Sequence, residues 1–111
     1  MNEADGCTLL CKLFLDAGYI IVPNYRFTED GVDVELDGWD ASARVGFEYI
    51  TEEANDARQF TLATLARFEA RMAKHELFVL LVDEHDAVTG DALEAAARSF
   101  LEHISNFRAK P

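Results

Sequence analysis

Residues 32–37 have the sequence VDVELD, in which apolar and acidic side chains alternate strictly. A period of two is typical of a half-buried strand, because successive side chains point to opposite faces of a sheet. The turn-forming stretch GWDAS follows at residues 38–42, and the alternation resumes in RVGFEYI at residues 44–50. Two alternating segments joined by a short turn predict an antiparallel hairpin, and this hairpin decides the fold.

The predicted hairpin also gathers acidic side chains on one side. A continuous core requires the apolar side chains of both strands to share one face, because a shift of one residue would expose the whole set. The opposite face then carries the acidic side chains of the two strands, which are Asp33, Glu35, Asp37 and Glu48. The sequence therefore predicts one apolar face and one acidic face.

The N-terminal part of the chain predicts a helix and a short strand before the hairpin. Apolar residues recur at helical spacing within residues 3–17, which is typical of an amphipathic helix. Cys7 and Cys11 lie side by side on this helix, in poor geometry for a disulfide, so we expect two small buried side chains. Residues 19–22 predict an edge strand, which Pro23 interrupts.

The C-terminal half predicts a helix, a strand and a second helix. A long helical pattern begins at about Asn55, and Thr89 is a suitable N-cap for the last helix. Residues 77–82 form an apolar run typical of a central strand covered on both faces. The prediction is one α/β (α+β) domain spanning residues 1–111. Its elements follow the order α-β-β-β-α-β-α around a mixed four-stranded sheet, in a three-layer-like arrangement.

The charge balance excludes several classes of partner. The chain of 111 residues carries 21 acidic and 10 basic side chains, a formal net charge of −11. Phosphate groups repel such a protein, so we expect neither a nucleic-acid partner nor an anionic membrane. No apolar run is long enough to span a membrane, and the acidic N-terminus is unlike a secretory signal. The sequence predicts a cytoplasmic protein whose charge favours a basic protein partner.

The acidic face of the hairpin is a candidate metal site. Like charges on neighbouring strands destabilise a sheet unless water or a cation surrounds them. Carboxylate oxygens suit Mg²⁺, Mn²⁺ or Ca²⁺, so Asp33, Asp37 and Glu48 are candidate ligands with Glu35 in support. The favoured interpretation is a solvated acidic surface that needs no cofactor, and a Mg²⁺ or Mn²⁺ site is the alternative.

The order of the elements and two short motifs resemble the PD-(D/E)xK superfamily of restriction-endonuclease-like proteins. The VDVELD stretch is similar to the family's acidic second strand, and EYI at residues 48–50 is similar to the acid-x-Lys triplet of its third strand. The resemblance covers about residues 3–107. It implies that Asp33 or Asp37 and then Glu48 hold a Mg²⁺ or Mn²⁺ ion that orients the attacking water.

The chain departs from this family at the lysine position of the triplet, which holds Ile50. A cationic side chain there stabilises the developing hydroxide and the charge of the transition state, and isoleucine cannot do so. Some members carry the lysine on a helix, which makes Lys12 and Arg58 candidates by position. Gln59 resembles a residue that some relatives carry near the site. Val32 stands where the motif has proline, so the resemblance implies a degenerate member.

Three functions follow as hypotheses. The leading one is a non-catalytic, nuclease-like domain that acts as an acidic interaction module, such as a regulator or an immunity-type inhibitor of a basic partner. The first alternative is a metal-dependent nuclease, a Mg²⁺-dependent phosphodiesterase that uses Asp33 and Glu48 with a displaced Lys or Arg. The second is a homodimeric structural module. Trp39, in the predicted turn, is a candidate contact residue, although a place in the core is the favoured expectation.

Overall fold

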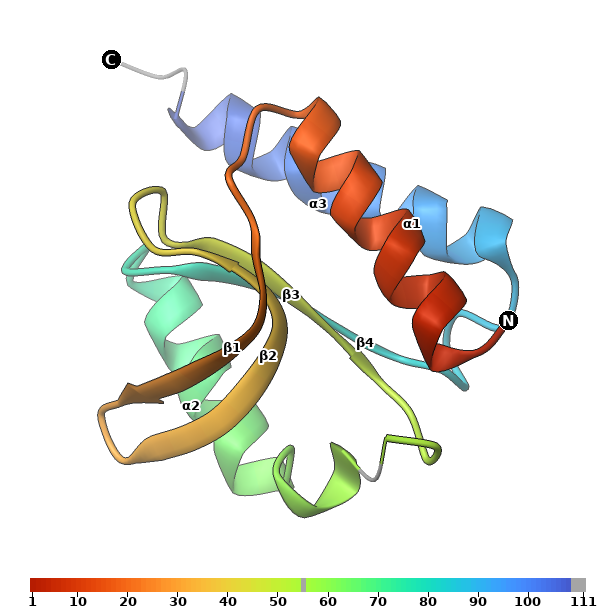
Figure 1. Ribbon diagram of the computed structural model, residues 1–111. Helices are drawn as coiled ribbons and strands as arrows, with labels where there is room; N and C mark the ends of the chain where they lie inside the picture. The colour runs from red at the N-terminus through yellow and green to blue at the C-terminus, as the bar shows by residue number, and fades with distance from the viewer. Residues whose placement is uncertain (55, 109–111) are drawn as a thin grey trace.

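The computed structural model describes residues 1–54 and 56–108, which form three layers (Figure 1). Helices α1 and α3 pack side by side over one face of a four-stranded sheet, and α2 covers the other face. The predicted order of elements and the mixed sheet are confirmed, with one additional 3-10 turn, η1. The elements are α1 (Glu3–Asp16), β1 (Val22–Glu29), β2 (Val32–Asp40), β3 (Val45–Ile50), η1 (Asp56–Arg58), α2 (Leu62–Ala73), β4 (Phe78–Asp83) and α3 (Gly90–Arg108).

The strands lie in the order β1-β2-β3-β4, with antiparallel β1–β2 and β2–β3 pairs and a parallel β3–β4 pair. The prediction that residues 77–82 form a central strand is wrong, since β4 lies at the edge of the sheet. Both of its faces are nevertheless covered, as predicted. Strand β1 is the other edge, but it begins later than predicted, at Val22, and includes Pro23. An edge strand tolerates proline because the missing N–H leaves no unpaired partner inside the sheet.

Apolar side chains form a separate core on each face of the sheet. The core under α1 and α3 includes Leu10, Phe14, Val45, Phe47, Tyr49, Leu93 and Ile104. The core under α2 includes Phe27, Val32, Val34, Leu36, Trp39, Phe60 and Phe68. Because the sheet is covered on both sides, neither face of the predicted hairpin is simply apolar or simply acidic.

The prediction that the apolar side chains of β2 and β3 share one face is wrong. Leu36 packs under α2, whereas Phe47 packs under α1 and α3. Leu36 and Trp39 both lie under α2, although residues three positions apart point to opposite faces of a regular strand. Gly38, between them, faces the Phe47 ring. The alternation along β2 therefore shifts by one residue at Asp37.

Helix α2 begins at Leu62, several residues after the predicted start, and Asn55 lies outside the described residues. Thr61 caps the helix by accepting a hydrogen bond from the Thr64 N–H at 3.2 Å, which fixes the start there. The predicted N-cap of the last helix is confirmed, since Thr89 Oγ1 accepts from the Ala92 N–H at 3.1 Å. None of the helices in the described ranges is long and apolar enough to cross a membrane.

One ionic cluster ties three elements together at the far end of the β1–β2 hairpin. Both terminal nitrogens of Arg44 donate to the Glu29 carboxylate, at 2.8 and 2.7 Å, and Arg71 Nη1 donates to it at 3.0 Å. These hydrogen bonds join β1, α2 and the residue before β3. The hydrogen bonds from Arg44, with further support from Arg71, lower the pKa of Glu29 to about 2.

Replacement of Glu29 by glutamine is expected to destabilise the fold by about 1 kcal/mol at neutral pH, because the three charge-assisted hydrogen bonds are half-exposed. A lowered pKa stabilises the fold above the unfolded value of 4.5 and loses this effect as the pH falls toward about 2. Urea unfolding at pH 7 and pH 2.5 measures both. The control is Glu94→Gln, whose exposed partner Arg98 lies one helical turn away; an equal loss in the two variants would contradict the role of Glu29.

Candidate functional site

The candidate site lies where β2 and β3 part. Their ladder runs from the pair Asp40–Val45 to the pair Gly38–Phe47. At the next position the two strands are joined instead by hydrogen bonds between backbone N–H groups and the side chains of Asp37 and Glu48. The Asp37 N–H donates to Glu48 Oε1 at 2.9 Å, and the Tyr49 N–H donates to Asp37 Oδ2 at 2.7 Å. Two carboxylates are therefore built into the gap between adjacent strands.

Helix α1 brings a third carboxylate to this gap. Thr51 Oγ1 donates to Glu3 Oε2 at 2.7 Å, and Cys7 Sγ donates to Glu3 Oε1 at 3.4 Å. The potential ligand atoms of Glu3, Cys7 and Asp37 all lie within 4.8 Å of one another. The first turn of α1 reaches the carboxyl ends of β3 and β4 (Figure 1). It can do so because Gly6 has no side chain to collide with the Tyr49 ring.

The segment after β3 contributes a fourth carboxylate. Asp56, the first residue of η1, is buried, and its Oδ2 accepts from the Thr51 N–H at 3.0 Å. Gln59, just after η1, fastens this segment to β2, because its side-chain oxygen accepts from the Glu35 N–H at 2.7 Å. We refer to Glu3, Asp37, Glu48 and Asp56 together as the acidic cluster.

Burial and mutual repulsion raise the pKa of every member of the acidic cluster. Burial is the largest cause for each carboxyl, and neighbouring acids of the cluster add to it. The effect is largest for Glu48, whose pKa rises to about 11 through burial first and then through Asp37 and Asp56. Burial, Asp37 and Glu3 likewise raise the pKa of the Cys7 thiol. The four acids thus lie close together, and no cationic side chain is among the causes of their pKa shifts.

Glu48 shows most directly that the acidic cluster is incomplete as it stands. Its side chain is 0% exposed. Oε1 accepts from the Asp37 N–H, but Oε2 has no hydrogen-bond partner among the described residues. A buried acceptor without a partner costs free energy, and such atoms are rare in folded proteins. A proton on Glu48, which its raised pKa favours, or a cation bound between the carboxyl groups would remove this cost.

The structure brings together only some of the predicted site residues. Asp37 and Glu48 meet, whereas Asp33 is exposed and pairs with Arg26 at 2.7 Å. Glu35 is also exposed, and only its backbone contacts Gln59. The shift in alternation at Asp37 explains this separation, because Asp37 turns toward β3 whereas the side chains of Asp33 and Glu35 face solvent.

The cationic candidates lie apart from the acidic cluster in the described structure. Lys12 is exposed on α1 and pairs with Asp16 at 3.7 Å. Arg58 is exposed on η1. Ile50, at the lysine position of the resemblance, packs against the core under α2. Trp39 is only 1% exposed and lies in β2 rather than in the predicted turn, so the favoured expectation of a core residue is confirmed.

Sequence patterns missed three residues of the site, Glu3, Cys7 and Asp56. Glu3 lies in the first turn of α1, where an acid is expected simply because it interacts favourably with the helix dipole. The spacing of Glu3 and Cys7 is one available signal, since residues four apart share a face of a helix. That face also carries Gly6, Leu10 and Phe14 toward the sheet.

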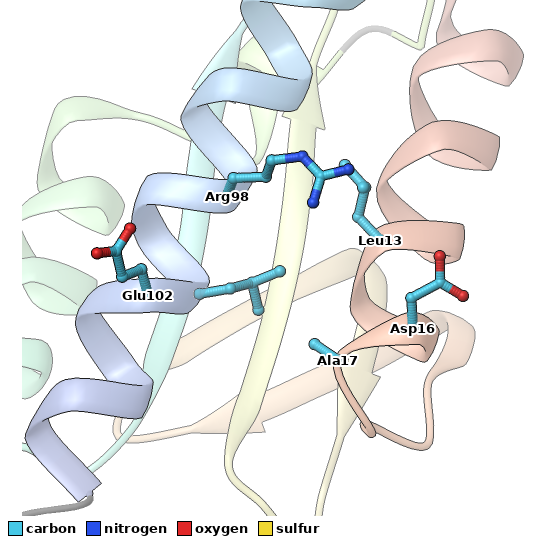
Figure 2. A pocket seen from close by; sticks show the side chains of 6 residues that line it. Leu13, Asp16, Ala17, Arg98 and Glu102 are labelled. Atoms are coloured by element: carbon cyan, nitrogen blue, oxygen red, sulfur yellow. The ribbon is translucent and has the colours of Figure 1, made fainter.

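A second concave region lies between α1 and α3, with a volume of about 390 Å³ (Figure 2). Figure 2 shows Arg98 extending from α3 toward Leu13 of α1, with Asp16 and Glu102 near the opening. Arg98 pairs with Glu94 at 2.9 Å, and both side chains are largely exposed. The charged side chains of this groove are exposed, which distinguishes it from the buried acidic cluster.

Comparison of the chain with family models, with curated proteins and with solved structures finds no match. The function is therefore argued from the acidic cluster itself.

Proposed function

We propose that the chain is a non-catalytic, nuclease-like domain that binds one divalent cation through Glu3, Asp37 and Glu48. The observation that carries the proposal is the buried Glu48 Oε2, which has no hydrogen-bond partner in the described structure and belongs to a carboxylate beside Asp37. Hard carboxylate oxygens from three different elements are a donor set that divalent cations accept. A cation would also relieve the repulsion that raises the pKa of each acid.

The absence of catalysis is proposed from the surroundings of the donor set. Metal-dependent phosphodiester cleavage needs positive charge near the attacking water and the scissile phosphate. Ile50 offers none, and Lys12 is paired with Asp16 on an exposed face of α1. A net charge of −11 also repels a polyanionic substrate. The cation would then hold α1 against the sheet rather than activate water.

The same charge supports a basic protein as the partner of this domain. Complementary charge raises the association rate and suppresses wrong partners, and the effect weakens as salt screens it. The alternative partner is a second copy of the chain. Sedimentation at two salt concentrations distinguishes self-association from binding to a basic protein. Association that persists unchanged at high salt would contradict a basic partner.

Thermal unfolding with Mn²⁺ tests the cation site. At a cation concentration of 100 times Kd, the folded state gains about 2.7 kcal/mol, or about 10 °C in Tm for a domain of this size. The metal-free protein in EDTA, at matched ionic strength, gives the reference. We expect Glu48→Gln to abolish the increase and Glu35→Gln to retain it, since Glu35 is an exposed acid on the same hairpin.

Two results would overturn the proposal. An unchanged Tm of the wild-type chain across Mg²⁺, Mn²⁺ and Zn²⁺ would show that the acidic cluster holds no cation. Cleavage of DNA or RNA that requires Mg²⁺ and disappears in Asp37→Asn would instead show that the domain is a nuclease. Asp33→Asn is the matched control for that assay, because Asp33 lies outside the acidic cluster and pairs with Arg26.

A further inference from the structure

We propose that the cation of the acidic cluster is a transition-metal ion of the Zn²⁺ or Co²⁺ class, with the Cys7 sulfur as one of its ligands. The inference rests on the proposed function, because it assigns a chemical class to the cation and adds a donor of a different kind. Oxygen donors alone favour Mg²⁺, Mn²⁺ or Ca²⁺, whereas a thiolate favours softer ions.

The position of Cys7 supports the inference geometrically. Its Sγ lies 3.4 Å from Glu3 Oε1, and the ligand atoms of Glu3, Cys7 and Asp37 lie within 4.8 Å of one another. Ligand atoms that share one tetrahedral Zn²⁺ are separated by about 3 to 4 Å, since each lies about 2.0 to 2.3 Å from the ion. Small side-chain movements are therefore enough to close the three donors around one ion.

The helix also presents two of these donors in a suitable arrangement. Glu3 and Cys7 are four residues apart in α1, so their side chains lie one above the other on a single face. Metal ligands on helices use this same spacing, because two side chains on one face can converge on a single ion. Asp37 then approaches from β2 as the third donor of the group. Glu48, whose Oε2 has no hydrogen-bond partner in the described structure, lies beside Asp37.

A thiol–carboxylate hydrogen bond accounts for the contact of Cys7 with Glu3 but not for the whole cluster. The hydrogen bond satisfies one oxygen of Glu3, and it leaves Glu48 Oε2 without a partner. Binding of the ion replaces that hydrogen bond by a metal–sulfur bond, and the thiol proton passes to solvent. The donors that lie together are then one sulfur, from Cys7, and two carboxylates, from Glu3 and Asp37.

Cys11 provides a matched comparison on the same helix. It lies one turn beyond Cys7, is likewise half-buried and is likewise a free cysteine. It packs against the core under α1 and α3 and is outside the group formed by Glu3, Cys7 and Asp37. A serine at either position changes the size of the side chain equally, so the two variants differ chiefly in their distance from the acidic cluster.

The test titrates Co²⁺ and Mg²⁺ into the wild-type chain, Cys7→Ser and Cys11→Ser, under reducing conditions. We expect the wild type to bind Co²⁺ more tightly than Mg²⁺ and to show a thiolate-to-cobalt charge-transfer band in the near ultraviolet. Cys7→Ser is expected to lose the band and to weaken Co²⁺ binding by about tenfold or more, with Mg²⁺ binding unchanged. Cys11→Ser is expected to behave like the wild type.

The outcomes separate the two proposals. If Co²⁺ binds without the band, and Cys7→Ser leaves its affinity unchanged, the sulfur is not a ligand and the inference fails while the cation site stands. If the wild type binds neither Co²⁺ nor Mg²⁺, the proposed function itself fails. A band that disappears in Cys11→Ser instead would place the metal at a different site and would overturn the inference.

Discussion

Replacement of Glu48 by glutamine is expected to stabilise the metal-free protein by about 3 kcal/mol at pH 7. The pKa of Glu48 is about 11 in the folded state, against 4.5 for an unperturbed glutamate, so folding at neutral pH must add a proton to this side chain. The cost grows by 1.36 kcal/mol for each pH unit above the unfolded pKa, which gives about 3 kcal/mol between pH 4.5 and 7.

Glutamine avoids this cost and keeps the hydrogen bonds of the site. Its side-chain oxygen can accept from the Asp37 N–H as Glu48 Oε1 does, and its NH₂ group can donate to the Asp37 carboxylate. A raised carboxyl pKa means that stability is complete below about pH 4.5 and declines as the pH rises toward 11. The advantage of the variant should therefore be small at pH 4 and large at pH 7 or 8.

Urea unfolding in EDTA at pH 4, 7 and 8 measures this difference. Glu35→Gln is the control for the loss of one negative charge, because Glu35 is exposed. A Glu48→Gln protein that is less stable than the wild type at pH 7 would mean that the Glu48 carboxylate is ionised and needed in the metal-free fold.

A methyl group at Gly46 is expected to destabilise the fold by about 3 kcal/mol or more. Gly46 pairs with Trp39 in the β2–β3 ladder. A Cβ atom there would collide with the carbonyl oxygen of Gly38 and with the Trp39 ring. The carbonyl belongs to the backbone of the neighbouring strand, so it cannot rotate away, and the strands would have to separate.

The expected destabilisation by Gly46→Ala is opposite in sign to the usual effect of a Gly→Ala substitution. Alanine in place of glycine usually stabilises a regular element by reducing the freedom of the unfolded chain. Gly90, at the start of α3, has nothing within 4 Å of its added Cβ and should show this ordinary, slightly stabilising behaviour. The urea midpoints of Gly46→Ala and Gly90→Ala provide the comparison. A Gly46→Ala protein as stable as the wild type would show that β2 and β3 are not packed this closely.

Local patterns predicted the elements well because the spacing of apolar residues within each element reflects which of its faces is buried. The alternation of VDVELD and RVGFEYI identified β2 and β3, and the helical spacing of apolar residues identified α1 and α3. The start of α2 was predicted too early because the apolar residues before Thr61 continue the helical spacing, whereas the Thr61 cap fixes the actual start. The order of elements followed from these assignments.

The acidic cluster was harder to predict because it forms where the ladder between β2 and β3 ends. Asp33, Glu35 and Asp37 look equivalent in the sequence, and only the shift in alternation sends Asp37 toward Glu48 and leaves Asp33 with Arg26. That shift results from packing on both faces of β2, which no single strand encodes. Glu3 belongs to a helix far from the hairpin in sequence, so only the tertiary fold places it at the site.

The contact between the first turn of α1 and the end of β3 closes a large loop in the chain. The partners of Glu3 there, Thr51 and Glu53, follow it by 48 and 50 residues. These hydrogen bonds fasten α1 to the sheet across this long stretch of chain in the folded state. A cation shared by Glu3, Asp37 and Glu48 would thus act as a reversible crosslink, removable by a chelator, between the beginning of the chain and the centre of its sheet.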